Sequence, residues 1–458
     1  MNRYHVWGGV ALALLVTVAT MAAGGGGTPA PISEMIAQLI ALAGIAILFL
    51  LRASGGEATQ PSLTRDQPLF ALLALWLALP LVQLVPLPAA LWQALPAREA
   101  LLAALQSVDA ASGWWPISLT PYRTIAAFLG LVPMVVVILM AVALPLRQRS
   151  VLLLAIVAVA AVSALLGIVQ VSSGGPWIYA RRQGDFAVGL IANRNAHADF
   201  LLIALLALTT LAQIYADRLR APLSRVLVGA LALYFVLGVV LTGSRTGMLL
   251  LSVPLLHAVW VFRGSLLSGR GWRMLLALPL AGALAVMGLF AMDGGNLQRS
   301  LDRFGQTSDG RLTDLWPDVI YAAKQSWPVG TGMGSFVPVF ESVEQLEVVD
   351  ETHPNRAHSD YLEIIMEAGI AGIALALTTL AAFAWRCRAI MVRETGLPRV
   401  LAGFALGAGV ILATHSLVDY PLRSITLSVA AAVAVSMLFR PRPAAAAATI
   451  QDKGMTTS

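Results

Sequence analysis

Ionisable side chains crowd the sequence where a long polar segment meets an apolar run. Within eight residues lie Arg356, His358, Asp360 and Glu363, and Glu367 follows one helical turn later. A histidine can accept a proton near neutral pH, and an arginine binds phosphate or carboxylate oxygens. A bilayer penalises such groups unless they pair or act. This junction is therefore a candidate catalytic site.

Arg245 is a second candidate, because it lies between two apolar runs in the sequence Leu-Thr-Gly-Ser-Arg-Thr-Gly. A guanidinium group keeps its charge, so at this depth it needs an anion, a carboxylate or water. His415 and Asp419 stand four residues apart at the end of another apolar run. Their spacing predicts that the two side chains bond to each other.

The glycine-rich segment 171–196 ends on Asn193, Arg194 and Asn195, directly before an apolar run. Polar residues at this place suggest a re-entrant or broken entry into the membrane, which is tolerated where the backbone lines a cavity. Arg194 could equally be an interfacial anchor whose charged end reaches water. Arg182 lies in the same segment and is a further candidate cation.

The polar segment 293–357 carries two further motifs. A helix is predicted from Arg311 to Gln325, and the glycines Gly330, Gly332 and Gly334 follow it. Glycines at this spacing allow either a close backbone approach to a ligand or a tight turn.

Composition identifies the class of protein. Hydrophobic residues make up 58% of the chain and charged residues 12%, which excludes a soluble domain. An apolar run of about 20 residues spans a bilayer as a helix. Such runs lie roughly at residues 7–23, 31–51, 68–87, 124–144, 151–170, 197–215, 226–243, 246–262, 274–292, 360–384, 400–417 and 424–439. The sequence therefore predicts an all-α polytopic membrane protein with about 12 transmembrane helices.

Cations are distributed unevenly among the connecting segments. With the N-terminus inside, 18 of the 30 Lys and Arg residues fall in inner segments, which predicts that both termini are cytoplasmic. The first run also resembles a secretory signal, but this chain enters the membrane repeatedly. Inner loops facing anionic lipid explain the net charge of +6, so no nucleic-acid partner is predicted. Cys387 is the single cysteine, which excludes an internal disulfide.

The predicted spans divide the chain into four parts. Residues 1–292 hold spans one to nine, residues 293–357 form a large periplasmic loop, and residues 358–440 hold spans ten to twelve. Residues 441–458 are predicted to be a disordered cytoplasmic tail. The charged junction therefore falls at the periplasmic boundary.

Taken in order, these motifs resemble the O-antigen ligase/polymerase family, which includes Wzy-type polysaccharide polymerases. The pattern comprises Gly-x-x-x-Asn-x-Asn before a span, Ser-Arg-x-Gly between spans, Gly-Arg-x-x-x-x-Trp and Gly-x-Gly-x-Gly-Ser-Phe in the outer loop, and Ala-His-Ser-Asp-Tyr-Leu-Glu at the junction. The resemblance covers most of residues 80–425, and the junction is its most specific element. Family members often have Asn where this chain has Ser359 or Asp360, and Pro where it has Arg194.

The resemblance implies a GT-C-like glycosyltransferase of the bacterial inner membrane. Such an enzyme takes a glycan from undecaprenyl diphosphate at the periplasmic face. The acceptor is lipid A-core for a ligase and a growing chain for a polymerase, and the sequence leaves both open. Related members modify proteins. A polytopic transporter is the alternative class, although no internal repeat supports it.

Glycosyl transfer from a diphosphate assigns roles to the candidate residues. The leaving diphosphate needs cations, and the acceptor hydroxyl has to lose a proton. His358 is the predicted base, with Glu363 or Asp360 to orient it; the alternative is a helix-start histidine without chemistry. No Asp-x-Asp motif or similar carboxylate cluster is present, so we predict inverting transfer without a metal or another cofactor. The predicted substrate-binding residues are Arg182, Arg194, Arg245, Arg311, Arg356, Asp360, Tyr361 and Glu363.

Overall fold

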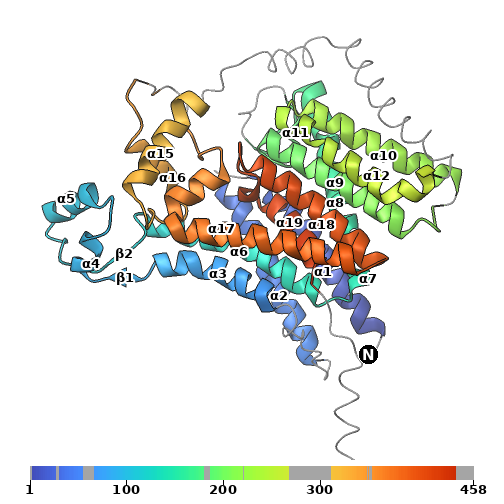
Figure 1. Cartoon of the computed structure of the whole chain (residues 1–458), viewed down its shortest axis with the longest axis horizontal. Helices are drawn as coiled ribbons and strands as arrows, with labels where there is room; N and C mark the ends of the chain where they lie inside the picture. Colours follow the sequence, from blue (N-terminus) through green and yellow to red (C-terminus); the bar gives the residue numbers. More distant parts are fainter. Residues whose placement is uncertain are drawn as a thin grey trace, which may run out of the picture.

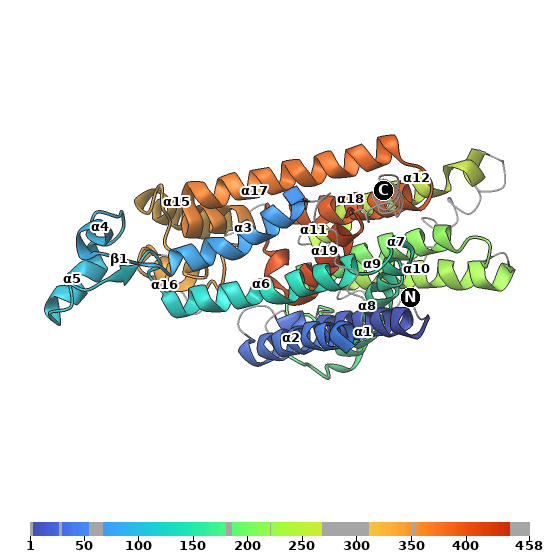
Figure 2. The same cartoon turned by 90° about the horizontal axis from the view of Figure 1, so that it is seen from below.

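The computed structural model describes residues 3–26, 30–54, 67–179, 186–219, 221–267, 311–347, 349 and 353–439. Within these residues the chain is mostly helical, and its sheet is the antiparallel pair of β1 (Pro86–Leu87) and β2 (Trp115–Pro116). Figures 1 and 2 show long helices packed side by side, with short elements gathered at one end. The prediction of an all-α protein with many apolar helices is confirmed for these residues.

Nine helical stretches of the described chain are long and apolar enough to cross a membrane. A helix satisfies its backbone polar groups internally, as a lipid environment requires. These stretches comprise α1 (Arg3–Ala23), α2 (Pro31–Ser54), α6 (Pro121–Val142), α7 with α8 (Leu146–Arg149 and Leu152–Ser173), α9 (Arg194–Ile214), α10 (Pro222–Leu241), α11 with α12 (Arg245–Leu250 and Ser252–Leu267), α17 (Asp360–Arg393) and α18 (Leu397–His415).

Two further helices, α3 (Gln67–Gln83) and α19 (Ile425–Ser436), are apolar but shorter. Eleven of the twelve predicted spans thus fall on helices of the structure. The twelfth, at residues 274–292, and most of the predicted loop before residue 311 lie outside the described residues.

The short elements surround the end of the bundle at which α17 begins (Figure 1). They are α4 (Ala89–Gln93), α5 (Glu99–Ser107), the π-helix η2 (Arg311–Leu315), α15 (Trp316–Gln325) and α16 (Phe336–Glu341); two 3₁₀-helices, η1 (Gly24–Gly26) and η3 (Pro421–Arg423), lie within the bundle. Val319 of α15 and Phe336 and Phe340 of α16 are buried together with Met366 of α17 in a small core. This core fixes α15 and α16 on the first turns of α17.

Gly369 divides α17 into two parts. Its backbone angles, φ +52° and ψ −139°, are not helical. A Cβ atom here would lie 2.0 Å from the carbonyl oxygen of Pro328, so the close approach requires glycine. Ile370 donates its amide hydrogen to that carbonyl at 3.0 Å. The first turns of α17, which carry the charged junction, are therefore held by the segment that follows α15.

Candidate active site

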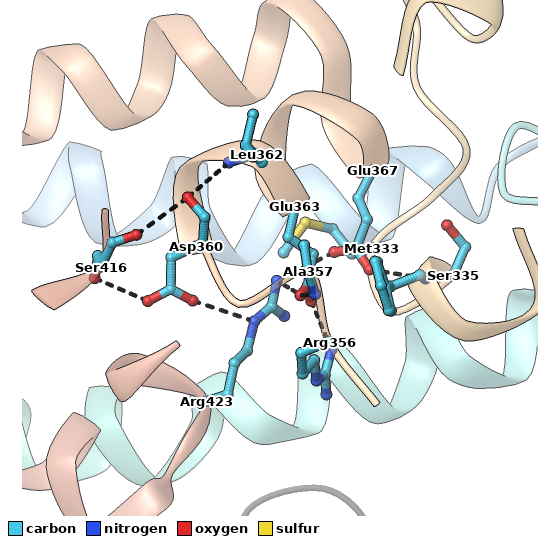
Figure 3. A network of polar contacts seen from close by, with 12 residues as sticks. Met333, Ser335, Arg356, Ala357, Asp360, Leu362, Glu363, Glu367, Ser416 and Arg423 are labelled. Carbon is cyan, nitrogen blue, oxygen red and sulfur yellow. Dashed lines mark hydrogen bonds and ion pairs between the residues drawn. The ribbon is translucent and has the colours of Figure 1, made fainter. Parts of the chain in front are cut away.

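The charged groups at the start of α17 pair with one another (Figure 3). Arg423 of η3 lies 3.0 Å from Glu363, 3.2 Å from Glu367 and 3.7 Å from Asp360. Arg356 donates to Glu363 at 2.8 Å. Both glutamate side chains are 0% exposed. Because an unpaired buried charge is costly, each carboxylate needs these guanidinium partners.

Arg423 was not predicted as a site residue. Burial acts to lower the pKa of its guanidinium group, but attraction by Glu363, Glu367 and Asp360 outweighs burial and raises the pKa above its usual value. The side chain is therefore charged at every physiological pH. The sequence shows Arg423 only as an arginine in the short connection between two apolar runs. Its carboxylate partners lie 56 or more residues away, so sequence spacing does not connect them to it.

His358 stands beside a different carboxylate from the predicted ones. Its Nδ1 atom lies 3.5 Å from Oδ1 of Asp419, and the edge of its ring meets Tyr420 at a centroid distance of 5.0 Å. Glu363 and Asp360, which the sequence offered as orienting residues, face the two arginines instead. Burial, reinforced by Asp419, raises the pKa of Tyr420 to about 12, so this phenol remains neutral.

The backbone of His358 is left-handed, with φ +48°. This conformation is unusual for a residue with a Cβ atom, and such residues cluster at functional sites. Both neighbours are anchored: the Ala357 amide donates to Glu363 at 3.1 Å, and the Ser359 hydroxyl donates to the Ser416 carbonyl at 3.3 Å. The charged network therefore fixes the segment that presents the imidazole, whose side chain is 24% exposed.

Asp419 connects His358 to the beginning of α9. The side-chain amide of Asn195 donates to Asp419, and the amide nitrogen of Asn193 lies 3.5 Å from the same carboxylate. Asn193 also caps α9, because its side-chain oxygen accepts a hydrogen bond from the backbone nitrogen of Asn195 at 2.7 Å. Arg194 lies between these two asparagines in the sequence.

Arg194 and Arg245 belong to two segments, distant in sequence, that both contact the side chain of Phe186. The guanidinium group of Arg194 lies 4.5 Å from the centre of the Phe186 ring. The same ring packs on Gly243, where a Cβ atom would lie 2.3 Å from it. Ser244 then caps α11 by accepting from the Gly247 amide at 3.1 Å, and Arg245 is the first residue of that helix. Phe186 therefore lies between the two turns that carry these arginines.

The predicted irregular entry into α9 is present. Residues 186–193 are not helical, and Ala187, Val188 and Ile191 within them are buried. The Ala187 amide donates to the Leu241 carbonyl at 3.1 Å, and the Ala192 amide donates to the Gly25 carbonyl at 2.8 Å. Protein thus surrounds this non-helical backbone, as the lipid environment demands.

Two of the predicted substrate-binding residues are not fully described by the structure, and a third, Tyr361, has a partner on a neighbouring helix. Arg182 lies outside the described residues, and Arg311 begins η2 with a side chain outside them. The hydroxyl of Tyr361 donates to the Ala413 carbonyl at 2.9 Å, so this side chain ties α17 to α18.

The glycines between α15 and α16 lie close to other parts of the protein. Gly330, Gly332 and Gly334 all have positive φ, and Cβ atoms there would lie 2.6, 2.4 and 2.7 Å from Glu367, Ser118 and Arg123. The amide of Gly332 also donates to the Glu367 carbonyl at 2.8 Å. Close packing against protein accounts for these positive φ angles, and Gly334 also lines a cavity between α3, α6, α17 and α19, so both interpretations of the glycines stay predictions.

His415 has a partner that its spacing did not indicate. Its Nδ1 atom lies 2.6 Å from Oδ1 of Asp199 on α9, and both side chains are buried.

The carboxylates at the start of α17 face guanidinium groups. Within the described residues no group of His, Cys, Asp and Glu side chains has the arrangement of a metal site.

Comparison with known families supports the resemblance seen in the motifs. Residues 229–377 match the family described as O-antigen ligase. The match covers less than half of the chain. No curated protein sequence matches the chain. The matched region includes Arg245, Arg311, Arg356 and His358, and the matched family suggests a membrane enzyme that transfers glycosyl groups.

Proposed function

We propose that the protein transfers a glycan from undecaprenyl diphosphate to a saccharide hydroxyl at the periplasmic face of the bacterial inner membrane, as a ligase or a polymerase. The observation that carries this proposal is the placement of His358. It has a left-handed backbone, a partly exposed ring and a carboxylate at 3.5 Å, at the outer boundary that the cation distribution predicts.

In this proposal His358 is the general base. Its Nδ1 atom carries a proton toward Asp419, so that Nε2 has a free lone pair for the acceptor hydroxyl. The acceptor oxygen then forms a bond to the anomeric carbon while the bond from that carbon to the diphosphate oxygen breaks. The diphosphate leaves with the electron pair, and attack from the opposite side inverts the anomeric configuration.

Arginine side chains bind the leaving diphosphate in this mechanism. Arg194 and Arg245 lie on neighbouring turns around Phe186, and Arg311 is assigned to the same role from its motif. Guanidinium groups form paired, charge-assisted hydrogen bonds to phosphate oxygens, and their charge stabilises the diphosphate as it departs. The partly exposed arginines Arg356 and Arg423 have a structural role, because glutamates already bind both.

The proposal is tested with purified full-length protein in liposomes that contain a lipid-linked glycan. We expect a longer or transferred glycan, detected by mass spectrometry with defined acceptors, and an unchanged rate in the presence of EDTA. Flux of the lipid-linked glycan across the membrane without any new glycosidic bond would identify a transporter and refute the proposal. Loss of the reaction in EDTA with recovery on adding Mg²⁺ would refute its metal-independent part.

A further inference from the structure

A cavity of about 450 Å³ lies beside the charged junction, between α3, α6, α17 and α19. Its volume falls within the range of about 300–1,000 Å³ that is usual for ligand pockets. The polarity of the side chains that line the cavity changes from one end to the other. Arginine and acidic side chains line one end, and aliphatic and aromatic side chains line the rest, including Leu73, Met134, Phe383 and Val435.

The cavity is long and runs along the helices. On α6 its lining extends from Arg123 to Ile138, a separation of fifteen residues that corresponds to a rise of about 22 Å in a helix. Along α19 it extends from Ile425, next to the junction, to Val435 near the opposite end of that helix. This length is about two thirds of the hydrocarbon thickness of a bilayer. An extended apolar chain with a polar head group has the same shape and polarity.

Arg123 is the cation at the polar end that is available to an anion. Arg356 and Arg423 also line this end, but they bind Glu363 and Glu367. Among the described residues, the polar and ring contacts of the Arg123 guanidinium group are with its neighbour Tyr122, by a 3.1 Å hydrogen bond to the hydroxyl and by stacking at 5.6 Å. Within the described residues no carboxylate pairs with it.

We propose that this cavity binds the lipid anchor of the acceptor, a single isoprenoid chain whose phosphate group contacts Arg123. The inference rests on the proposed function, which places the donor diphosphate at Arg245. That arginine is on α11, which packs against α9, α10, α12 and α18, whereas α6 packs against α1, α2, α3, α7 and α19. The two lipid substrates therefore reach His358 from different sides.

The size of the cavity selects among acceptor lipids. A cavity near the lower end of the ligand-pocket range accommodates one chain, whereas lipid A carries several acyl chains. The geometry therefore favours an acceptor linked to polyprenyl phosphate, which is the acceptor of a polymerase.

Gly130 offers a way to fill the cavity without disturbing the backbone. It lines the cavity on α6, and a Cβ atom at this position meets no atom within 4 Å. Gly229 on α10 is equally open but is not part of the lining. The pair Gly130→Trp and Gly229→Trp therefore compares the same substitution inside and outside the cavity.

The test measures transfer from one lipid-linked donor to two acceptors, a saccharide on polyprenyl diphosphate and the same saccharide without lipid. For Gly130→Trp we expect the rate with the lipid-linked acceptor to fall at least tenfold relative to the lipid-free acceptor, and no change for Gly229→Trp. Arg123→Gln should raise the KM for the lipid-linked acceptor about tenfold, because it removes a charge-assisted contact. Equal effects on both acceptors, or none, would overturn the inference.

Photolabelling tests the cavity independently of catalysis. A polyprenyl phosphate bearing a diazirine should label residues of α6 and α19 in the wild type and in Gly229→Trp, but not in Gly130→Trp. Excess polyprenyl phosphate should prevent labelling, and lipid A or a two-chain phospholipid should not. Labelling on other helices, or competition by lipid A, contradicts the inference. A protein that labels as expected but forms no glycosidic bond would refute the proposed function alone.

Discussion

Glu363→Gln should destabilise the junction more than any other conservative change there. The Glu363 side chain is 0% exposed and meets three donors: Arg356 at 2.8 Å, Arg423 at 3.0 Å and the Ala357 amide at 3.1 Å. Glutamine keeps the shape but loses the charge, and its NH₂ group faces one of these donors. Removing one partner of a buried ion pair costs about 3–5 kcal/mol. Because Arg423 keeps Glu367, we expect about 3 kcal/mol.

The assay is reversible unfolding in mixed micelles of detergent and sodium dodecyl sulfate, followed by tryptophan fluorescence. Glu341→Gln is the matched control, since Glu341 is exposed at the end of α16 and a surface substitution changes stability by about 0.5 kcal/mol or less. A free energy of unfolding for Glu363→Gln that equals that of the control would refute the view that the buried network stabilises the junction.

Three further predictions concern the site and its supports. Asp419→Asn should lower the transfer rate about tenfold or more without raising the KM for the donor, because it removes the charge beside His358; steady-state kinetics test this. Arg245→Gln should raise the KM for the lipid-linked donor about tenfold, with partial recovery in Arg245→Lys, as donor titrations would show. Gly334→Ala should cost about 1–3 kcal/mol in unfolding experiments, since φ is +83° and the new Cβ would lie 2.7 Å from the Arg123 carbonyl.

Much of the architecture could be predicted because a membrane span depends on local composition. Runs of about 20 apolar residues are read directly from the sequence, and the helices α1, α2, α6, α8 and α9 begin and end within a few residues of the predicted limits. The limits of α17 were less predictable. The predicted span began at Asp360 and ended at residue 384, but the helix continues to Arg393 and is broken at Gly369.

The candidate site was predictable in its residue types but not in its pairings. Arg356, His358 and Glu363 are close in sequence, so their proximity needed no structure. Asp419 and Arg423 reach the same place from 56 or more residues away, through the turn that follows α18. Such contacts depend on how helices pack, and helical periodicity within one segment contains no information about a distant segment.

His415 and the outer glycines show two other limits of the sequence. An i, i+4 spacing makes a contact possible, but a buried carboxylate on another helix, Asp199, supplied the observed hydrogen bond. The glycines at 330, 332 and 334 permit close approach to either ligand or protein. In the structure Gly330 packs against the backbone of Glu367, while Gly334 lines a cavity, so the glycine pattern alone does not choose between these interpretations.

The central claim is that His358 removes the acceptor proton, and a single-turnover transfer assay with His358→Gln tests it most directly. The control is His353→Gln, since His353 is an exposed histidine of the same outer segment. A general base contributes about 10²–10⁴-fold to the rate, so we predict a loss of at least about 100-fold for His358→Gln, with donor binding retained, and a wild-type rate for the control. Transfer by folded His358→Gln protein at the wild-type rate would contradict the account.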